Sequence, residues 1–183
     1  MARSADVVLV IDVESTCWEK NPPEGQISEI IEVGLCPVEV GSLNRVEKRS
    51  ILVKPQRSEI SRFCTELTSL HSGMFDDAGS LADAATILRT EYRSKDRLWA
   101  SWGDYDRRQF ERVCEAHGVG YPFGTSHLNI KSLFAVATGQ REMGLAEAYR
   151  QLGWTMEGTH HRGHDDAWNI AGILCELLQR MRS

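Results

Sequence analysis

Residues 7–14 read Val-Val-Leu-Val-Ile-Asp-Val-Glu, a β-branched and apolar run that ends in acids. Such a run is typical of a central strand buried on both faces. Successive side chains of a strand point to opposite faces, so Asp12 and Glu14 would project from one face, roughly 6 to 7 Å apart. Two carboxylates so placed repel each other unless cations lie between them. On its own, this spacing is more typical of two solvated acids at a strand end.

The chain that follows predicts an antiparallel pair of strands beside this one. Glu29–Val40 and Arg45–Lys54 are rich in β-branched and apolar residues, and Gly41–Asn44 between them has the composition of a hairpin turn. Farther along, apolar residues at helical spacing predict a helix from Ser80 to about Arg93, with Ser80 as its N-cap.

The second half of the chain predicts one more strand and three helices. The strand covers Leu98–Trp102, and the helices cover Asp106–His117, Gly144–Leu152 and about Asp165–Met181. The last helix aligns these apolar side chains on one face: Ala167, Ile170, Leu174, Leu177 and Met181. This order favours an α/β fold with a mixed central sheet flanked by helices. In open sheets of this kind, ligands lie beyond the carboxyl ends of the strands, where the acids stand.

Length and composition indicate an ordinary globular protein. With 183 residues, 42% hydrophobic and 26% charged, the chain suits one domain spanning residues 1–183. No apolar run approaches the roughly 20 residues of a membrane span, and residues 1–6 lack the pattern of a signal peptide, so we expect a cytoplasmic protein. The five scattered cysteines form no paired motif, which favours reduced and mostly buried thiols.

Asp106 introduces a third acid, at the start of the helix that follows the strand Leu98–Trp102. Helix N-termini favour carboxylates, so Asp106 could be no more than a helix cap. Asp104 could fill that role equally well.

A further polar cluster precedes the last helix. Residues 160–166 read HHRGHDD, and His161 stands five residues before Asp166. This spacing allows a loop histidine to lie over a site whose metal is held by the aspartate. A local N-cap with surface histidines would explain the same residues. The presence of all three acidic elements, in this order along one chain, favours the metal site.

Longer stretches around these acids form an ordered series: VIDVESTCWE at residues 10–19, EIIEVG at 29–34, VKP at 53–55, FCTELTSL at 63–70 and HRGHDDAWNIA at 161–171. The series resembles the DEDDh 3′→5′ exonucleases, the family of RNase T and the epsilon subunit of DNA polymerase III. Within it, the first stretch is close to the IDFEATCWE of the Eri-like branch, which includes the histone-mRNA 3′ exonuclease. The resemblance covers essentially all of the chain and implies the RNase H-like exonuclease fold.

The resemblance also implies a function. The chain would remove nucleotides from the 3′ end of RNA or single-stranded DNA by two-metal-ion hydrolysis. By motif, the first acidic element is Asp12 with Glu14, the second is Asp106, and the third is His161 with Asp166. The four acids would hold two Mg²⁺ or Mn²⁺ ions, and His161 would be the general base. The bound cations would also explain how a chain of net charge −5 can bind nucleic acid.

Substrate contacts at a 3′ end usually involve stacking or apolar wedges. Trp18, Phe63 and Leu67 are the candidates here, although ordinary packing would also explain them. By the resemblance, the backbone around Glu14 and Ser15 would contact the terminal nucleotide, and a contact to its 2′-OH would favour RNA. His161 would lie next to the same nucleotide. Candidates for phosphate contacts are Arg107, Arg108, Lys131, Arg141 and Arg162.

Two other functions remain open. The chain could be a catalytically weak nucleic-acid-binding protein of the same fold, but the presence of all five catalytic residue types argues against this. It could also be a proofreading-type DNA exonuclease subunit, which would use the same site. One departure from the family is His164, where the family usually has leucine or a similar residue.

Overall fold

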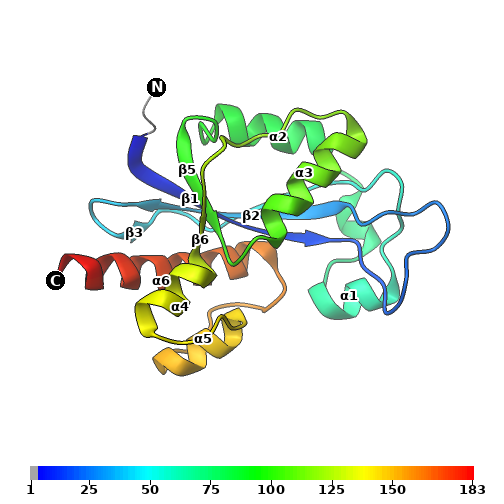
Figure 1. Cartoon of the computed structure of the whole chain (residues 1–183). Coiled ribbons are helices and arrows are strands. Elements are labelled where there is room, and N and C mark those ends of the chain that lie inside the picture. The colour runs from blue at the N-terminus through cyan, green and yellow to red at the C-terminus, as the bar shows by residue number, and fades with distance from the viewer. Residues whose placement is uncertain (1–3) are drawn as a thin grey trace.

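The computed structural model describes residues 4–183, in which one mixed sheet lies between two layers of helices (Figure 1). Residues 1–3, on which the expectation of no signal peptide partly rests, lie outside the described residues. The strands are β1 (Ser4–Ser15), β2 (Ile30–Glu39), β3 (Asn44–Arg45), β4 (Arg49–Leu52), β5 (Arg97–Ser101) and β6 (His127–Asn129). The helices are α1 (Arg62–Thr68), α2 (Leu81–Thr90), α3 (Tyr105–His117), α4 (Ile130–Thr138), α5 (Leu145–Leu152) and α6 (Gly163–Arg182), with a short 3₁₀ helix, η1 (Ser72–Phe75).

The sheet has the order β3-β2-β1-β5-β6, and β4 also pairs with β2. Strand β1 runs antiparallel to β2 and parallel to β5, which confirms the predicted mixed sheet with β1 at its centre. In Figure 1, α2 and α3 lie above the sheet, and α4, α5 and α6 lie below it. No helix within residues 4–183 is both long and apolar enough to span a membrane.

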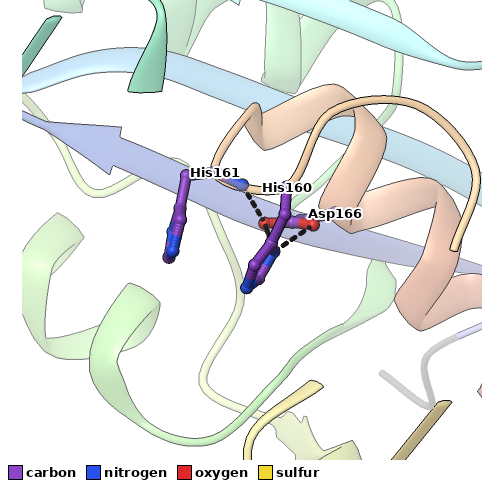
Figure 2. A group of neighbouring side chains, drawn as sticks. All are labelled: His160, His161 and Asp166. Atoms are coloured by element: carbon purple, nitrogen blue, oxygen red, sulfur yellow. Dashed lines mark hydrogen bonds and ion pairs between the residues drawn. The ribbon is translucent and has the colours of Figure 1, made fainter. Parts of the chain in front are cut away.

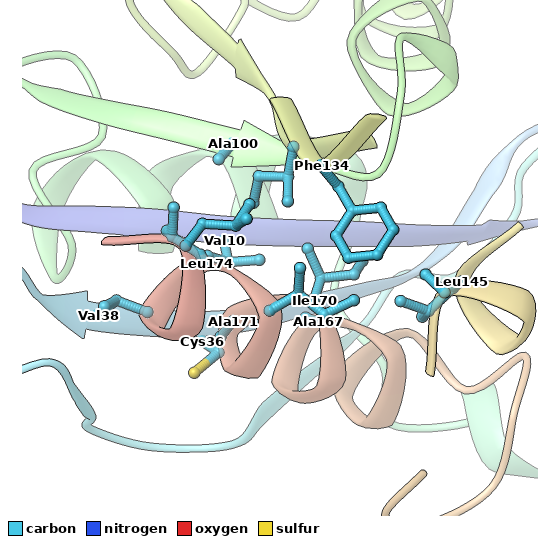
Figure 3. Close-up of a cluster of buried hydrophobic side chains, with 14 of the residues drawn as sticks. Val10, Cys36, Val38, Ala100, Phe134, Leu145, Ala167, Ile170, Ala171 and Leu174 are labelled. Atoms are coloured by element: carbon cyan, nitrogen blue, oxygen red, sulfur yellow. The ribbon is translucent and has the colours of Figure 1, made fainter. Parts of the chain in front are cut away.

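The side chains of β1 alternate between the two helical layers. Val10 lies in the core shared with α4, α5 and α6, part of which Figure 3 shows. Leu9 and Ile11 lie in the opposite core, which includes residues of α2 and α3. Because the side-chain period of a strand is two, Asp12 and Glu14 continue the series of Val10. The predicted common face of the two acids is therefore the face that α6 covers.

The predicted strand Arg45–Lys54 is wrong as a single element, because it is divided into β3 and β4. Val38 of β2 pairs with Arg45, whereas Leu35 pairs with Arg49. Three steps along β2 thus match four steps along its partner, which leaves one extra residue in the partner, as in a β-bulge. The predicted hairpin turn that precedes β3 is confirmed, with Leu43 at a φ of 59°.

Several other elements differ from the prediction. Helix α1, strand β6 and helix α4 were not predicted, although Ser61 and Asn129 cap the two helices through their side chains. The predicted N-cap Ser80 is confirmed, since its side chain accepts a hydrogen bond from the backbone N–H of Asp83. Met181 is 70% exposed and does not continue the buried stripe of α6. All five cysteines are free, and three of them are buried.

Helix α6 begins in backbone contact with the sheet. A Cβ placed on Gly34 of β2 would lie 1.9 Å from both the carbonyl carbon and the carbonyl oxygen of Gly163. A Cβ on Gly163 would lie 3.1 Å from the carbonyl oxygen of Asp12. Only a residue without a side chain fits at Gly34, and this brings the first turn of α6 over the end of β1.

We therefore expect Gly34→Ala to lower the free energy of unfolding by about 1–3 kcal/mol or more, the usual cost of overpacking a tight core. The matched control is Gly41→Ala in the hairpin turn, where an added Cβ meets nothing within 4 Å. That control should change the stability by less than about 0.5 kcal/mol. Urea denaturation followed by circular dichroism measures both. Equal stability of the two variants would show that α6 does not depend on this contact.

Candidate active site

Three carboxylates from two distant parts of the chain meet at the end of β1. Asp12, Glu14 and Asp166 each offer an oxygen, and these oxygens lie within 4.8 Å of one another. Asp166 comes from the first turn of α6 and is only 4% exposed, and Glu14 is 9% exposed. The structure thus brings together three of the four acids that were predicted to bind metal.

Asp106, the fourth of these acids, lines the same cavity, which has a volume of about 320 Å³. It stands in the first turn of α3, is buried, and accepts a hydrogen bond of 2.9 Å from the backbone N–H of Val13. Asp104 occupies the N-cap position without capping the helix, and its carboxylate instead binds Arg107 at 2.9 Å. Of the two aspartates considered, Asp106 is therefore the one that reaches the cavity.

The carboxylates of this cavity repel one another. Burial, together with repulsion from Asp106, Glu14 and Asp166, raises the pKa of Asp12 well above its usual range. Burial and the neighbouring acids raise the pKa of Glu14 to about 9. Burial also raises the pKa of Asp106 to about 6, although the N–H of Val13 opposes the shift. A buried group of oxygen donors with this charge imbalance is suited to hard divalent cations.

His161 reaches the cavity from the loop before α6. Its backbone has a φ of 65°, in the left-handed region, and its N–H donates a hydrogen bond of 2.9 Å to Asp166. The ring lines the cavity beside the carboxylates. Burial and the neighbouring His160 lower the pKa of the His161 imidazole below its usual value. The ring is therefore neutral at physiological pH and able to accept a proton.

His160 also lines the cavity, although the sequence had not indicated a role for it. Its Nδ1 lies 3.0 Å from each carboxylate oxygen of Asp166. Its ring stacks on the ring of His161, with 4.0 Å between the centroids, and Figure 2 shows both rings on the same side of the loop. The five-residue spacing to Asp166 pointed to His161 alone.

Glu32, a second residue that was missed, fixes the start of α6. It is fully buried on β2, directly opposite Glu14 in the strand pairing. It accepts hydrogen bonds from the backbone N–H of Gly163 at 3.0 Å and from Nδ1 of His164 at 2.8 Å. Burial raises the pKa of Glu32, but hydrogen bonds, that of His164 among them, outweigh it and hold the pKa below its usual value. His164, where the chain departs from the family, is thus part of this anchor.

Most of the basic residues considered for phosphate contacts already have acidic partners. Arg107 and Arg108 both pair with Asp104. The other pairs are Arg141 with Glu147 and Arg162 with Glu32. The alkyl chain of Lys131 runs beside Gly103, next to the cavity residue Trp102.

The residues predicted to contact a nucleotide lie around the end of β1. Phe63 and Leu67 are 39% and 40% exposed on α1, so ordinary core packing does not explain them. The N-cap of α1, Ser61, donates a hydrogen bond of 2.6 Å to the carbonyl of Cys17, which ties this helix to the segment after β1. Trp18, in that segment, is half-buried.

Ser15 was also predicted to contact the nucleotide, but its side chain is hydrogen-bonded to another residue of the protein. Its hydroxyl accepts a hydrogen bond of 2.9 Å from Nε2 of Gln109. The side chain is buried, so a contact with a nucleotide would have to come from the backbone.

Comparisons with known proteins give the same family. The sequence profile of the family described as Exonuclease (RNase T) matches residues 9–174. The 3′-5′ exonuclease Snipper of Drosophila melanogaster is 25% identical over an alignment 195 residues long, gaps included. The alignment covers 94% of this chain and 69% of Snipper. The human 3′-5′ exoribonuclease 1 is 28% identical over an alignment 190 residues long, which covers 95% of this chain and 53% of the human protein. The chain thus spans about half the length of that relative.

A crystal structure is similar over nearly the whole chain. The nuclease domain of 3′hExo, a DEDDh family member bound to rAMP, is 25% identical and has a TM-score of 0.87. The match covers 98% of this chain and 95% of that domain. The predicted RNase H-like exonuclease fold is therefore confirmed. The chain belongs to the exonuclease (RNase T) family, on the DEDDh branch of 3′-5′ exonucleases that includes the Eri-like exoribonucleases.

Proposed function

We propose that this chain removes nucleotides from the 3′ end of RNA or single-stranded DNA by metal-dependent hydrolysis, with His161 as the general base. The observation that carries the proposal is the convergence of Asp12, Glu14 and Asp166 within 4.8 Å, in a cavity that Asp106 and His161 also line. The family to which the chain belongs consists of exonucleases.

Asp12, Glu14, Asp106 and Asp166 would hold two Mg²⁺ or Mn²⁺ ions. All four offer only oxygen, the donor that these hard cations prefer. Bound ions would supply the positive charge that activates a water and stabilises the leaving 3′ oxygen. The pKa of Glu14, raised to about 9, is what we expect of a metal-binding carboxylate that lies beside other acids without its cation.

His161 is suited to accept the proton of the attacking water. The oxygen of that water forms a bond to phosphorus while the bond from phosphorus to the 3′ oxygen breaks, and a 5′-nucleotide leaves. The lowered pKa keeps the ring unprotonated before attack. The hydrogen bond from its backbone N–H to Asp166 couples the loop to the carboxylate cluster.

RNA is the substrate that we favour. Among the relatives, the human protein is named an exoribonuclease, and the 3′hExo domain was crystallised with rAMP. The exposed pair Phe63 and Leu67 offers an apolar platform on which a terminal base can stack without readout of its sequence. A cytoplasmic location stays a prediction.

The direct test is a panel of 5′-labelled RNA and DNA oligonucleotides with Mg²⁺ or Mn²⁺. We expect a ladder of products shortened from the 3′ end, which EDTA abolishes. His161→Ala should lower kcat by about 10²–10⁴-fold, the usual contribution of a general base. His71→Ala, which changes an exposed histidine on another loop, is the matched control and should keep full activity. Intact RNA and DNA after incubation with wild-type protein would instead favour a protein that only binds nucleic acid.

Because the acids of the cavity repel one another, removing one of them should lower activity but raise the stability of the metal-free protein. Asp12→Asn should abolish activity, yet raise the metal-free melting temperature by a few degrees, since about 1 kcal/mol corresponds to about 2–4 °C at this size. The variant should also lose most of the stabilisation that Mg²⁺ gives the wild type.

Asp77→Asn, at an exposed acid, is the control for Asp12→Asn and should behave as the wild type does. Differential scanning calorimetry with and without Mg²⁺ measures all three proteins. A lower metal-free melting temperature of Asp12→Asn would contradict the proposed charge imbalance.

The apolar platform predicts a change in substrate binding. The double variant Phe63→Ala with Leu67→Ala should raise KM for oligonucleotides roughly tenfold or more, because stacking contributes about 1–3 kcal/mol per base. Steady-state kinetics on a labelled RNA measures the change, with Val136→Ala, at an 81% exposed residue of α4, as the control. An unchanged KM in the double variant would remove α1 from the substrate site.

A further inference from the structure

We propose that His160, His161 and Asp166 form a second metal site, which takes borderline transition ions such as Zn²⁺ and which switches the nuclease off when filled. One ring nitrogen of each histidine and one carboxylate oxygen of Asp166 lie within 4.8 Å of one another. The metal site stands on this geometry alone, whereas the inhibition rests on the function proposed above.

The spacing of two ligands is already close to that of a zinc site. Nδ1 of His160 lies 3.0 Å from each carboxylate oxygen of Asp166. In a tetrahedral zinc site with bonds of about 2.0–2.2 Å, two ligand atoms are roughly 3.3–3.5 Å apart. An ion bound to both groups therefore needs them only a few tenths of an ångström farther apart, with the ring of His160 turned so that its Nδ1 faces the ion.

The backbone of the loop brings the third ligand to the same side. Side chains of consecutive residues usually diverge, but His161 has a φ of 65°, and its ring stacks 4.0 Å from that of His160 (Figure 2). The hydrogen bond from the backbone N–H of His161 to Asp166 fixes the loop in this position. His160 is exposed, so an ion can enter from solvent and keep a water as its fourth ligand.

The donor types select the ion. Two imidazoles and one carboxylate suit Zn²⁺, Cu²⁺ or Ni²⁺ far better than Mg²⁺, which takes oxygen ligands. Asp12, Glu14 and Asp166 form the all-oxygen group that suits Mg²⁺ or Mn²⁺. Asp166 belongs to both groups, so an ion held by the histidines withdraws this carboxylate from the oxygen group. It also binds the imidazole of His161, the ring that would accept the proton.

Metal binding is tested first, without any substrate. Zn²⁺ is titrated into metal-free protein by calorimetry, and Co²⁺ by its visible absorption, which reports tetrahedral coordination. His160→Gln should weaken the binding of Zn²⁺ at least tenfold, because even the loss of an outer partner of a metal ligand costs about 10–100-fold. His71→Gln, at an exposed histidine on another loop, is the matched control and should bind as the wild type does. Equal Zn²⁺ affinity of wild type and His160→Gln would overturn the site.

Inhibition is tested next, on labelled RNA in millimolar Mg²⁺. Zn²⁺ should inhibit the wild type and His71→Gln at the same concentration, and His160→Gln should need at least about tenfold more. The same Zn²⁺ sensitivity in all three proteins would overturn the switch. A wild type that binds Zn²⁺ through His160 but degrades no nucleic acid would refute the proposed function and leave the metal site standing. A nuclease whose Zn²⁺ binding ignores His160 would refute the metal site and leave the function standing.

Discussion

The candidate site depends on how closely the first turn of α6 approaches β1 and β2. Gly34 and Gly163 are in backbone contact, so no side chain separates the helix from the strands. Glu32 adds an electrostatic reason for this position, because a buried carboxylate satisfies the free N–H of Gly163 at the positive end of the helix. Together these contacts place Asp166, three residues into α6, beside Asp12. A shift of the helix would leave the acids of β1 without their partner.

This arrangement concentrates negative charge where water cannot screen it. The fold keeps the acids close because apolar contacts on both faces of β1 outweigh the repulsion at its end. Stability and function therefore oppose each other at the cavity, as they do at many active sites. Divalent cations would resolve the conflict, so we expect folding and metal binding to be coupled in this chain.

Local sequence signals predicted the parts of the fold that lie in long periodic segments. The run before Asp12 and the apolar stripe of α6 are such segments, and both elements were found where expected. Helices α1 and α4 have only seven and nine residues, so each carries roughly two turns of pattern, and their N-caps Ser61 and Asn129 were the clearer signal. The division between β3 and β4 follows from a register shift against β2, which no single segment encodes.

The residues of the site divide in the same way. Motif spacing identified the acids and His161, whereas Glu32 requires knowledge of its pairing opposite Glu14. His160 reaches the site because the backbone of His161 is left-handed, which turns the two consecutive rings to one side. Asp166 then lies between an all-oxygen group and a group with two imidazoles. Linkage is reciprocal. If a transition ion lowers the affinity for Mg²⁺ through this shared carboxylate, Mg²⁺ must lower the affinity for the transition ion by the same factor. Under the proposed switch, one buried carboxylate would make the activity of the cavity depend on which class of metal ion is in excess.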